Sequence, residues 1–370
     1  MEKKNIAFIE METHSALLEQ WYLLLKSMQY IDFHFFVSAK VNEKLTAIPK
    51  EYITIVVSVA KTDFSIFDGV VVNTLHRNFK DYQNLFQSKP VLCLVHNLNF
   101  SLFFKTISFS NIFKEKEKFV YFLKLYLKEK VASRRKIILK AKRIGVISAS
   151  VLDAIKKEGR YAANSYLIQM NYCKESSLPD DDTIQIVMPG NVSNKRKDVD
   201  LLFEILPKLK PKSKLHFTFL GKPENDSVLQ HLEKLKATTH FNITITHFHQ
   251  FIPWETYSEI IRKAHLLLCP IKNKTSFYWV DEYYGSTKVS GSEADCVYNG
   301  KIGLFPISYP KMDWCNWQYK DAFQLSEILN DLTLAKLHAE YSHLQGYIQK
   351  YTFDSVKNKL EEQLIELTQN

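Results

Sequence analysis

The chain has 370 residues, of which 46% are hydrophobic and 24% charged, a composition that excludes a disordered or collagen-like protein. This length fits two domains of about 150 to 200 residues each. The five cysteines are scattered without a CxxC pair, which indicates a reduced, cytoplasmic protein. No apolar run is long enough for a signal peptide or a membrane span.

Short apolar runs alternate with helical patterns through the first half of the chain. The run at 5–10 is followed by a helical spacing at 16–28. Further strand-like runs lie at 31–39, 53–59, 67–73, 90–97 and 143–150. Runs buried on both faces are typical of a parallel sheet covered by helices. We therefore expect residues 1–175 to form a doubly wound, Rossmann-like α/β domain that holds the acceptor.

The same alternation restarts after a polar, turn-rich stretch at 174–182. Strand-like runs lie at 183–190, 215–221, 241–248, 265–271 and 303–307, with helical patterns between most of them. We expect residues 180–345 to form a second Rossmann-like domain. The last segment, 346–370, is expected to be a helix that packs back on the first domain.

A first candidate site lies where the strand at 183–190 ends. Gly190 closes the strand, and three cations stand just before the helix expected from residue 198, namely Lys195, Arg196 and Lys197. Cations beside the free N–H groups of a helix N-terminus suit a diphosphate. The alternative is a solvated basic turn.

A second candidate site lies between the strands at 265–271 and 303–307. The small residues Ser290 and Gly291 let the backbone approach a ligand, and Asp295 lies about one turn into the helix that they open. A carboxylate there can accept hydrogen bonds from ribose hydroxyls. Alternatively, Ser290 caps the helix and Asp295 compensates its dipole.

In their order along the chain, these motifs resemble the glycosyltransferases of the GT-B fold, and among them the large retaining family 4. In that family a strand ends in Gly and a basic residue follows six positions later, as Gly190 and Arg196 do here. Glu282 matches an acidic residue three positions before a glycine, and Asp295 matches a carboxylate five positions before Gly-Lys. The resemblance covers residues 183–306. It implies two Rossmann-like domains that face each other across a cleft.

The resemblance also implies roles for individual residues. The turn at Phe251 and Ile252 would hold the nucleobase through backbone groups, and Glu282 would bind the sugar hydroxyls. The arginine that usually follows the first glycine is replaced by Asn191, so the cations further on would neutralise the diphosphate. The implied donor-binding residues are Gly190, Lys195, Arg196, Lys197, Phe251, Ile252, Glu282, Ser290, Gly291 and Asp295.

Glycosyl transfer needs stabilisation of the charge that grows on the leaving nucleoside diphosphate, and an acceptor hydroxyl held near the anomeric carbon. Arg196 and Lys197 can supply that stabilisation, so neither a metal nor another cofactor is expected. His96 follows a buried strand of the first domain, and in similar enzymes such a histidine contacts the donor sugar or the acceptor. A histidine of the core is the alternative, and His14 and His76 are weaker candidates.

The net charge of +9 is concentrated in residues 102–143, which carry an excess of about ten positive charges. Cations alternate there with aromatic and aliphatic residues at helical spacing, as in helices that lie on anionic membranes. A solvated helix that buries its apolar stripe is the equal alternative. Nucleic acid is not expected as a partner, because no recognised binding module accompanies the charge.

The sequence therefore predicts a retaining, metal-independent hexosyltransferase that moves a sugar from a nucleotide-sugar donor to a glycan or a lipid-linked acceptor. Such an enzyme would serve glycan or polysaccharide biosynthesis, in the cytoplasm or peripherally at the inner face of the membrane. Two alternatives remain: a sugar-nucleotide epimerase of the same fold, and a non-enzymatic protein that binds nucleotides or polyanions. Product analysis with and without an acceptor separates the epimerase from the transferase.

Overall fold

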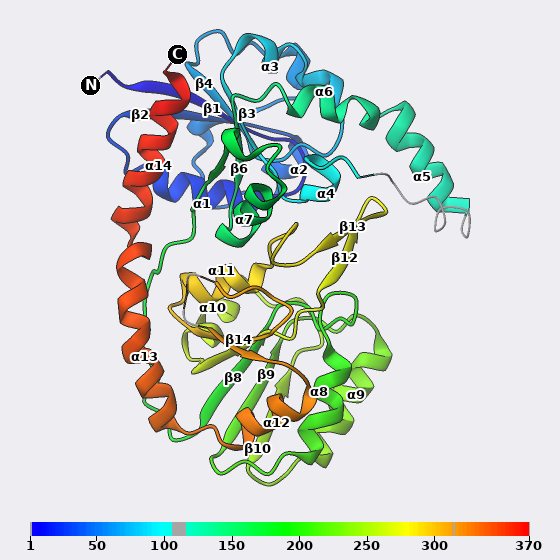
Figure 1. The fold of residues 1–370 in the computed structure, drawn as a ribbon, viewed down its shortest axis with the longest axis vertical. Coiled ribbons are helices and arrows are strands. Elements are labelled where there is room, and N and C mark those ends of the chain that lie inside the picture. Colours follow the sequence, from blue (N-terminus) through cyan, green and yellow to red (C-terminus); the bar gives the residue numbers. More distant parts are fainter. Residues whose placement is uncertain (1, 106–115, 313, 315, 370) are drawn as a thin grey trace. The chain divides into compact units, whose positions relative to one another are not determined.

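The computed structural model describes residues 2–105, 116–312, 314 and 316–369, and they form two compact units (Figure 1). The N-terminal unit comprises Met1–Met170, Ser276–Val289 and Asp354–Asn370, and the C-terminal unit comprises Asn171–Thr275 and Ser290–Phe353. The sequence had indicated 1–175, 180–345 and 346–370. The main difference is the segment 276–289, which we expected in the C-terminal domain and which groups with the N-terminal unit.

The N-terminal unit is built on a parallel sheet in the order β3-β2-β1-β4-β5-β6-β7. This is the strand order of a doubly wound Rossmann-like sheet, and its direction switches between β1 and β4. The strands are β1 (Lys4–Glu10), β2 (Ile31–Val37), β3 (Ile53–Ile55), β4 (Gly69–Val72), β5 (Val91–Leu94), β6 (Arg143–Val146) and β7 (Ser165–Leu167).

Helices cover this sheet because their apolar stripes match its buried strands. Trp21 of the first helix packs on Phe8 of β1, and neither side chain is exposed. The last helix belongs to the same unit, since Glu361 accepts a hydrogen bond from the backbone N–H of Tyr30 at 2.5 Å. The helices are α1 (Ser15–Leu25), α2 (Ala39–Asn42), α3 (Leu85–Ser88), α4 (Leu98–Ser101), α5 (Lys116–Leu127), α6 (Arg134–Ile138), α7 (Ala149–Glu158) and α14 (Phe353–Thr368).

A hairpin formed by β12 (Lys274–Phe277) and β13 (Val280–Tyr283) explains the grouping of residues 276–289. Val280 is buried in the core of the N-terminal unit. The Glu282 carboxylate accepts hydrogen bonds from the backbone N–H groups of Asn99 at 3.2 Å and Phe100 at 2.9 Å. Sequence reasoning expected a turn in this part of the chain and predicted neither the two strands nor the partner that they pack on.

The C-terminal unit repeats the same wiring, with a parallel sheet in the order β10-β9-β8-β11-β14-β15. The strands are β8 (Ile184–Pro189), β9 (Leu215–Leu220), β10 (Ile243–His247), β11 (Leu266–Leu268), β14 (Ile302–Pro306) and β15 (Asn316–Tyr319). The helices are α8 (Val199–Ile205), α9 (Asp226–Thr238), α10 (Trp254–Arg262), α11 (Gly291–Tyr298), α12 (Ala322–Asn330) and α13 (Leu334–Ile348).

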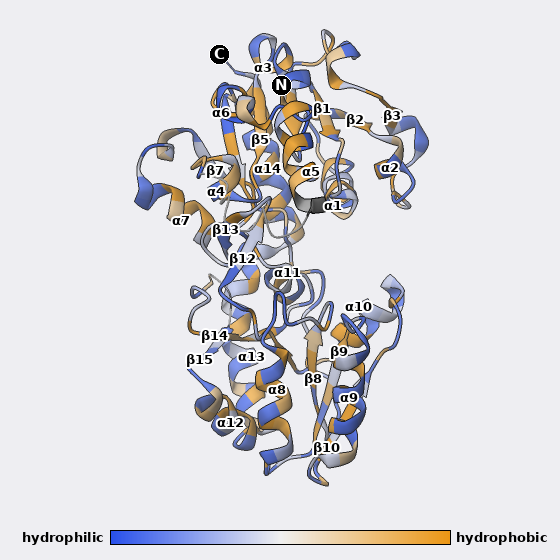
Figure 2. Cartoon of the chain, turned by 90° about the vertical axis from the view of Figure 1, so that its right-hand side faces the viewer, coloured by the Kyte–Doolittle hydropathy of each residue, from blue (hydrophilic) through white to orange (hydrophobic). Residues whose placement is uncertain are grey.

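Hydropathy follows this layering in both units. The central strands carry mostly apolar residues, while helices such as α8 and α9 alternate apolar and polar residues along their surfaces (Figure 2). The strand order reverses between β1 and β4 in the N-terminal sheet and between β8 and β11 in the C-terminal sheet. Open α/β sheets bind ligands at the carboxyl ends of the strands at such a point. The predicted fold class, two doubly wound α/β domains, is confirmed.

Candidate functional site

A cavity of about 300 Å³ opens in the C-terminal unit, beside the carboxyl ends of β8 and β9. Four residues that the sequence assigned to donor binding line it, and the other lining residues come from the turn after β8, from the end of β9 with the turn that follows it, and from α10. The lining residues are Gly190, Asn191, Leu220, Gly221, Lys222, Phe251, Ile252, Trp254, Tyr257 and Asp295. The fold therefore brings together residues from four separate stretches of the sequence.

Two glycines at the ends of β8 and β9 make the close approach of these loops possible. Gly190 has a φ of 78°, in the left-handed region that disfavours other residues. A Cβ at Gly221 would lie only 2.4 Å from the Gly190 carbonyl oxygen, so a side chain there would push the loops apart. The lining backbone of the cavity depends on both glycines.

Lys197 lies behind this lining. Its side chain is buried, and its ammonium group donates hydrogen bonds to the carbonyl oxygens of Pro189, of Gly190 at 2.8 Å and of Asn191 at 3.0 Å. An ammonium group has three N–H donors, so these carbonyls use all of them. Burial lowers the pKa of Lys197 to about 8, which leaves it charged at neutral pH. In this arrangement Lys197 holds the turn after β8 and places a positive charge beneath the cavity wall.

The other two cations of the first candidate site are exposed. Lys195 forms an ion pair with Glu224, which also accepts a hydrogen bond from the Ser193 hydroxyl at 2.5 Å. Arg196 is exposed on the turn before α8. Neither Lys195 nor Arg196 is among the described residues that line the cavity. Their predicted contact with a diphosphate stays a prediction.

An Asp-x-Asp pattern, which sequence reasoning missed, spans the start of α8 at Asp198 and Asp200. Both carboxylates accept hydrogen bonds at the start of α8. Asp198 caps α8 by accepting a hydrogen bond from the N–H of Leu201 at 3.4 Å, and Asp200 accepts one from the Asn194 side chain at 2.7 Å. Local capping accounts for this pair of aspartates.

Asp295 faces the cavity from α11. The Tyr257 hydroxyl donates a hydrogen bond to its carboxylate at 3.1 Å. Burial raises the pKa of Asp295 to about 6, opposed by the Tyr257 hydrogen bond and by the charge of Lys197. The carboxylate is therefore ionised at neutral pH and can accept hydrogen bonds from hydroxyl groups of a ligand.

The start of α11 is open to a ligand. Ser290 caps the helix, and its hydroxyl oxygen accepts a hydrogen bond from the N–H of Ser292 at 3.3 Å. A Cβ built on Gly291 would meet no other heavy atom within 4 Å, so the backbone is accessible there. The capping role and a ligand-binding role are compatible, because the cap uses the Ser290 side chain and leaves the Gly291 backbone uncovered.

Aromatic residues from the loop after β10 and from the first turn of α10 line the cavity. Phe251 is 85% exposed and Trp254 is 61% exposed, whereas Ile252 between them is buried. Trp254 stacks on Tyr257 with a centroid distance of 5.8 Å. Sequence reasoning missed Trp254 and Tyr257. Their spacing of one helical turn after a Pro at residue 253 was the signal that could have found them.

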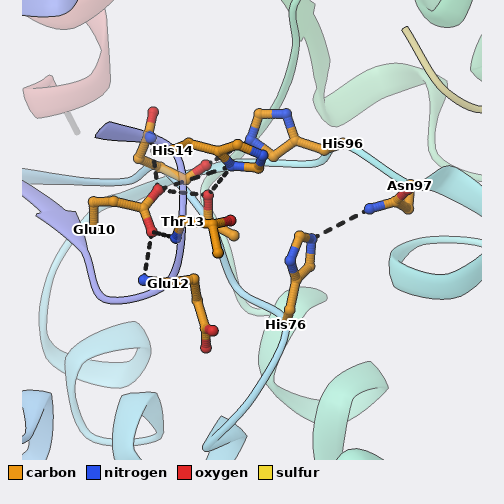
Figure 3. A network of polar contacts seen from close by, with 9 residues as sticks. Glu10, Glu12, Thr13, His14, His76, His96 and Asn97 are labelled. Carbon is orange, nitrogen blue, oxygen red and sulfur yellow. Dashed lines mark hydrogen bonds and ion pairs between the residues drawn. The ribbon is translucent and has the colours of Figure 1, made fainter. Parts of the chain in front are cut away.

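The N-terminal unit has a second polar site at the corresponding switch between β1 and β4 (Figure 3). Glu10 is fully buried at the end of β1. Its carboxylate accepts hydrogen bonds from the backbone N–H groups of Glu12 at 2.6 Å and Thr13 at 3.2 Å. The side chains of Asn73 and Thr74 donate to it at 2.8 and 2.6 Å. Glu10, which sequence reasoning did not single out, thus fixes the loop that follows β1.

Three histidines gather next to this loop. His14 lies with its ring centroid 4.4 Å from that of His96, and His76 lies 6.3 Å from His96 (Figure 3). Burial lowers the pKa of all three, for His96 to about 3. His96 donates through Nε2 to the Asn73 carbonyl oxygen at 2.8 Å. Because the neutral ring carries one N–H, its Nδ1 is a hydrogen-bond acceptor.

The hairpin segment adds a cation to this site. Lys288 donates through Nζ to the Asn97 side-chain oxygen at 2.7 Å, and the Asn97 amide lies 3.4 Å from His76 Nε2. The sequence predicted a role for Glu282 in binding sugar hydroxyls. In the structure Glu282 belongs to the N-terminal unit, and its carboxylate accepts hydrogen bonds from the start of α4, as described above.

The basic stretch at 102–143 is described except for residues 106–115. Arg134 is buried there, with its guanidinium 4.7 Å from the Phe100 ring centroid. On α5, by contrast, Val120 and Leu127 are each 66% exposed, and Lys124 and Lys128 are exposed beside them. Leu125 is buried on the same helix, so the apolar stripe of α5 is only partly covered.

Solved structures with the same architecture are known, although their sequences differ widely from this one. HepE from Anabaena in complex with UDP aligns with a TM-score of 0.60 at 12% identity, over 99% of this chain and 100% of that one. The lipopolysaccharide outer core galactosyltransferase WaaB gives 0.57 at 12% identity, over 98% and 99%.

The N-terminal domain of trehalose-6-phosphate phosphatase from Candida albicans aligns with a TM-score of 0.59 at 12% identity, over 99% of this chain and 96% of that one. No family model matches the sequence, and no curated protein does. The structural likeness shows the fold: the chain has the GT-B fold.

Proposed function

Because the chain has the GT-B fold, we propose that it is a glycosyltransferase that binds a nucleotide-sugar donor in its C-terminal unit. The observation that carries the proposal is the cavity at the ends of β8 and β9. It gathers Gly190, Ile252 and Asp295 from separate parts of the chain, and the sequence had predicted all three to bind the donor.

Each part of a nucleoside diphosphate has a suitable partner in this proposal. The Asp295 carboxylate accepts from the ribose hydroxyls, and the backbone at Phe251 and Ile252 contacts the base. The diphosphate lies toward the open N-terminus of α11 at Gly291, where free N–H groups and the helix dipole favour anions. HepE has been crystallised with UDP and with UDP-glucose, so uridine nucleotides are the first to test.

The chemistry that we propose is metal-independent transfer with retention of configuration, and it uses no other cofactor. Charge that grows on the leaving diphosphate is stabilised by helix-terminal N–H groups and by Arg196, with Lys197 acting through the turn that it holds. On the N-terminal unit, His96 Nδ1 accepts a hydrogen bond from a sugar or acceptor hydroxyl. The neutral ring suits this role, because burial keeps the pKa of His96 near 3.

For the acceptor we propose a glycan or a lipid-linked molecule presented at an anionic membrane surface, at its cytoplasmic face. Among the described residues, no helix is long and apolar enough to cross a membrane. The exposed side chains of Val120 and Leu127, with exposed Lys124 on α5 and exposed Lys128 just after it, are the observation that supports peripheral binding. Apolar groups enter the interface while lysines meet anionic headgroups.

The test is a thermal-shift screen of nucleotide sugars, followed by product analysis. We expect one class of nucleotide sugar to stabilise the wild-type protein and the control Asp226→Asn, whose change lies on α9, but to stabilise Asp295→Asn much less. A new glycosidic product that forms only when acceptor is added supports transfer. An isomerised or hydrolysed nucleotide sugar without acceptor favours the epimerase alternative, and the absence of any nucleotide effect on the wild type excludes the proposal.

A further inference from the structure

Two histidines and a glutamate meet at the free edge of the C-terminal sheet. His247 is the last residue of β10, His249 follows two positions later, and Glu233 lies on α9. Glu233 Oε1 is 3.0 Å from His247 Nε2 and 3.6 Å from His249 Nε2. One nitrogen from each histidine and one carboxylate oxygen all lie within 4.8 Å of one another. The proposed nucleotide site uses none of these side chains.

The packing of β10 and α9 holds the three side chains close together. The chain bends just after β10, and the ring centroids of His247 and His249 lie 5.3 Å apart. Helix α9 packs on β10 and brings Glu233 to the two rings. The His247 side chain is only 5% exposed, while those of His249 and Glu233 are more than half exposed. One ligand is thus fixed by packing, and the other two can adjust to an ion.

We propose that these three residues bind a divalent transition-metal ion of the zinc class, through Nε2 of both histidines and a carboxylate oxygen of Glu233. In a tetrahedral site with metal–ligand bonds of about 2.0 to 2.1 Å, neighbouring ligand atoms lie about 3.3 Å apart. The two observed distances to Glu233 bracket that value. Imidazole nitrogens with one carboxylate suit Zn²⁺, whereas Mg²⁺ and Ca²⁺ prefer oxygen ligands alone.

The simpler alternative is an ion pair between protonated histidine and Glu233. Two imidazole nitrogens converge on the same Glu233 oxygen, at 3.0 and 3.6 Å, whereas an ion pair needs only one of them. The zinc titration described below separates the two alternatives.

Such an ion would link the loop between β10 and α10 to helix α9. Residues 248–253 connect β10 to α10, and they include His249 as well as Phe251 and Ile252, which line the cavity. A ligand that holds His249 restricts this loop. If the cavity binds the nucleotide as proposed above, the ion and the nucleotide raise or lower each other's affinity by the same factor, since coupling between two sites is reciprocal.

Zn²⁺ binding to the full chain, in competition with a chromophoric chelator and without nucleotide, tests the site directly. We expect one equivalent to bind, and His249→Ala and Glu233→Gln each to weaken binding tenfold or more. The matched control is His231→Ala, an exposed histidine elsewhere on α9. A hundredfold excess of Mg²⁺ should not displace Zn²⁺. If wild type binds no Zn²⁺, or if all three variants bind it equally, the proposal is wrong.

Hydrogen exchange supplies a second readout that does not depend on nucleotide. With Zn²⁺ present, amide exchange in residues 248–253 should slow in wild type and in His231→Ala but not in His249→Ala. Unchanged exchange in a protein that binds Zn²⁺ would overturn the role of the ion in holding the loop. UDP affinity with and without Zn²⁺ then tests the coupling. A protein that binds Zn²⁺ but none of the screened nucleotide sugars contradicts the proposed function and leaves the metal site standing.

Discussion

Burial of Asp295 disfavours the ionised carboxylate, which is the form that the proposed binding role uses. Burial raises the pKa of this carboxyl from 3.8 to about 6, so the folded protein binds the proton more tightly than the unfolded chain does. The ionised carboxylate is consequently a cost to folding above about pH 6, and this cost disappears below about pH 4. A carboxylate kept at such a cost, in the wall of a cavity, is typical of a ligand-binding group.

We therefore predict two effects of Asp295→Asn. Nucleoside diphosphate affinity should fall about tenfold at pH 7.5, because a hydrogen bond to a charged group contributes about 1.5 to 3 kcal/mol. The thermal midpoint at the same pH should stay equal or rise, and the difference should vanish toward pH 4. Calorimetry and thermal denaturation across this pH range measure both. An unstable variant with unchanged affinity would mean that Asp295 only supports Tyr257.

His96 is fixed by its hydrogen bond to the Asn73 carbonyl and is neutral from pH 5 to 8, since its pKa is lowered to about 3. We predict that His96→Ala lowers the turnover number of glycosyl transfer at least tenfold. Affinity for UDP should not change, because UDP binds the other unit in our proposal. Steady-state kinetics and calorimetry make the comparison, with His34→Ala on β2 as the control. Equal loss in both variants would indicate a general effect on folding.

Some site residues could be predicted from the sequence and others could not, for a physical reason. Gly190 and Asp295 stand next to a strand end and a helix start, so local rules place them. Glu10 and Tyr257 act through partners that are distant in sequence, such as Thr74 and Asp295. A pattern along the chain carries no information on such partners without the fold.

Among the elements, the turn between β8 and α8 contains three consecutive cations, residues 195–197, which have different roles. The Lys197 ammonium holds three carbonyls, whereas Arg196 is exposed. We predict that Lys197→Met lowers the free energy of unfolding by about 2 to 4 kcal/mol, because buried carbonyls lose a charged donor. Arg196→Ala should change it by less than about 0.5 kcal/mol and weaken UDP binding about tenfold.

Urea titration and calorimetry on the same two variants separate these roles. Reduced UDP affinity in Lys197→Met is expected too, since the turn lines the cavity. The division of roles would be refuted by an Arg196→Ala protein that binds UDP as wild type does, or by a Lys197→Met protein that is as stable as wild type.

The hairpin β12–β13 is the element that the sequence placed least well. Its strands and turn are local features, but its position depends on Val280 in the core of the N-terminal unit and on Glu282 at the start of α4. The resemblance assigned Glu282 to the donor because an acidic residue stands three positions before a glycine. The structure shows a carboxylate with backbone partners, and burial raises its pKa to about 7.

For the whole molecule, the fold class followed from the alternation of buried strands and amphipathic helices, because parallel sheets impose that pattern twice along the chain. The six strands of the C-terminal sheet follow the order of the first six of the seven N-terminal strands, and the chain leaves the C-terminal unit at residue 276 and returns at 290. The alternation predicts the sheets well. It does not predict the excursion, since a short hairpin follows the same local rules in either unit.

The charge of the whole molecule leads to the last prediction. Residues 102–143 carry a net charge of about +10, and the whole chain carries +9. The rest of the chain is therefore nearly neutral. The charged helix α5 also exposes Val120 and Leu127. We predict that binding to liposomes rises with anionic lipid content and falls with salt, because exposed charges are screened over about 10 Å at 0.1 M salt.

Substitutions should be chosen from the exposed residues, because Arg134 is buried against Phe100 and its loss would disturb the fold. The double variant Arg135→Gln with Lys136→Gln should weaken the salt-dependent part of liposome binding. The double variant Val120→Gln with Leu127→Gln should weaken the part of liposome binding that does not depend on salt. Both double variants should keep their nucleotide affinity and lose activity only on lipid-linked acceptors. Equal sedimentation of wild type with neutral and anionic liposomes would instead mean that these charges serve a soluble, anionic acceptor.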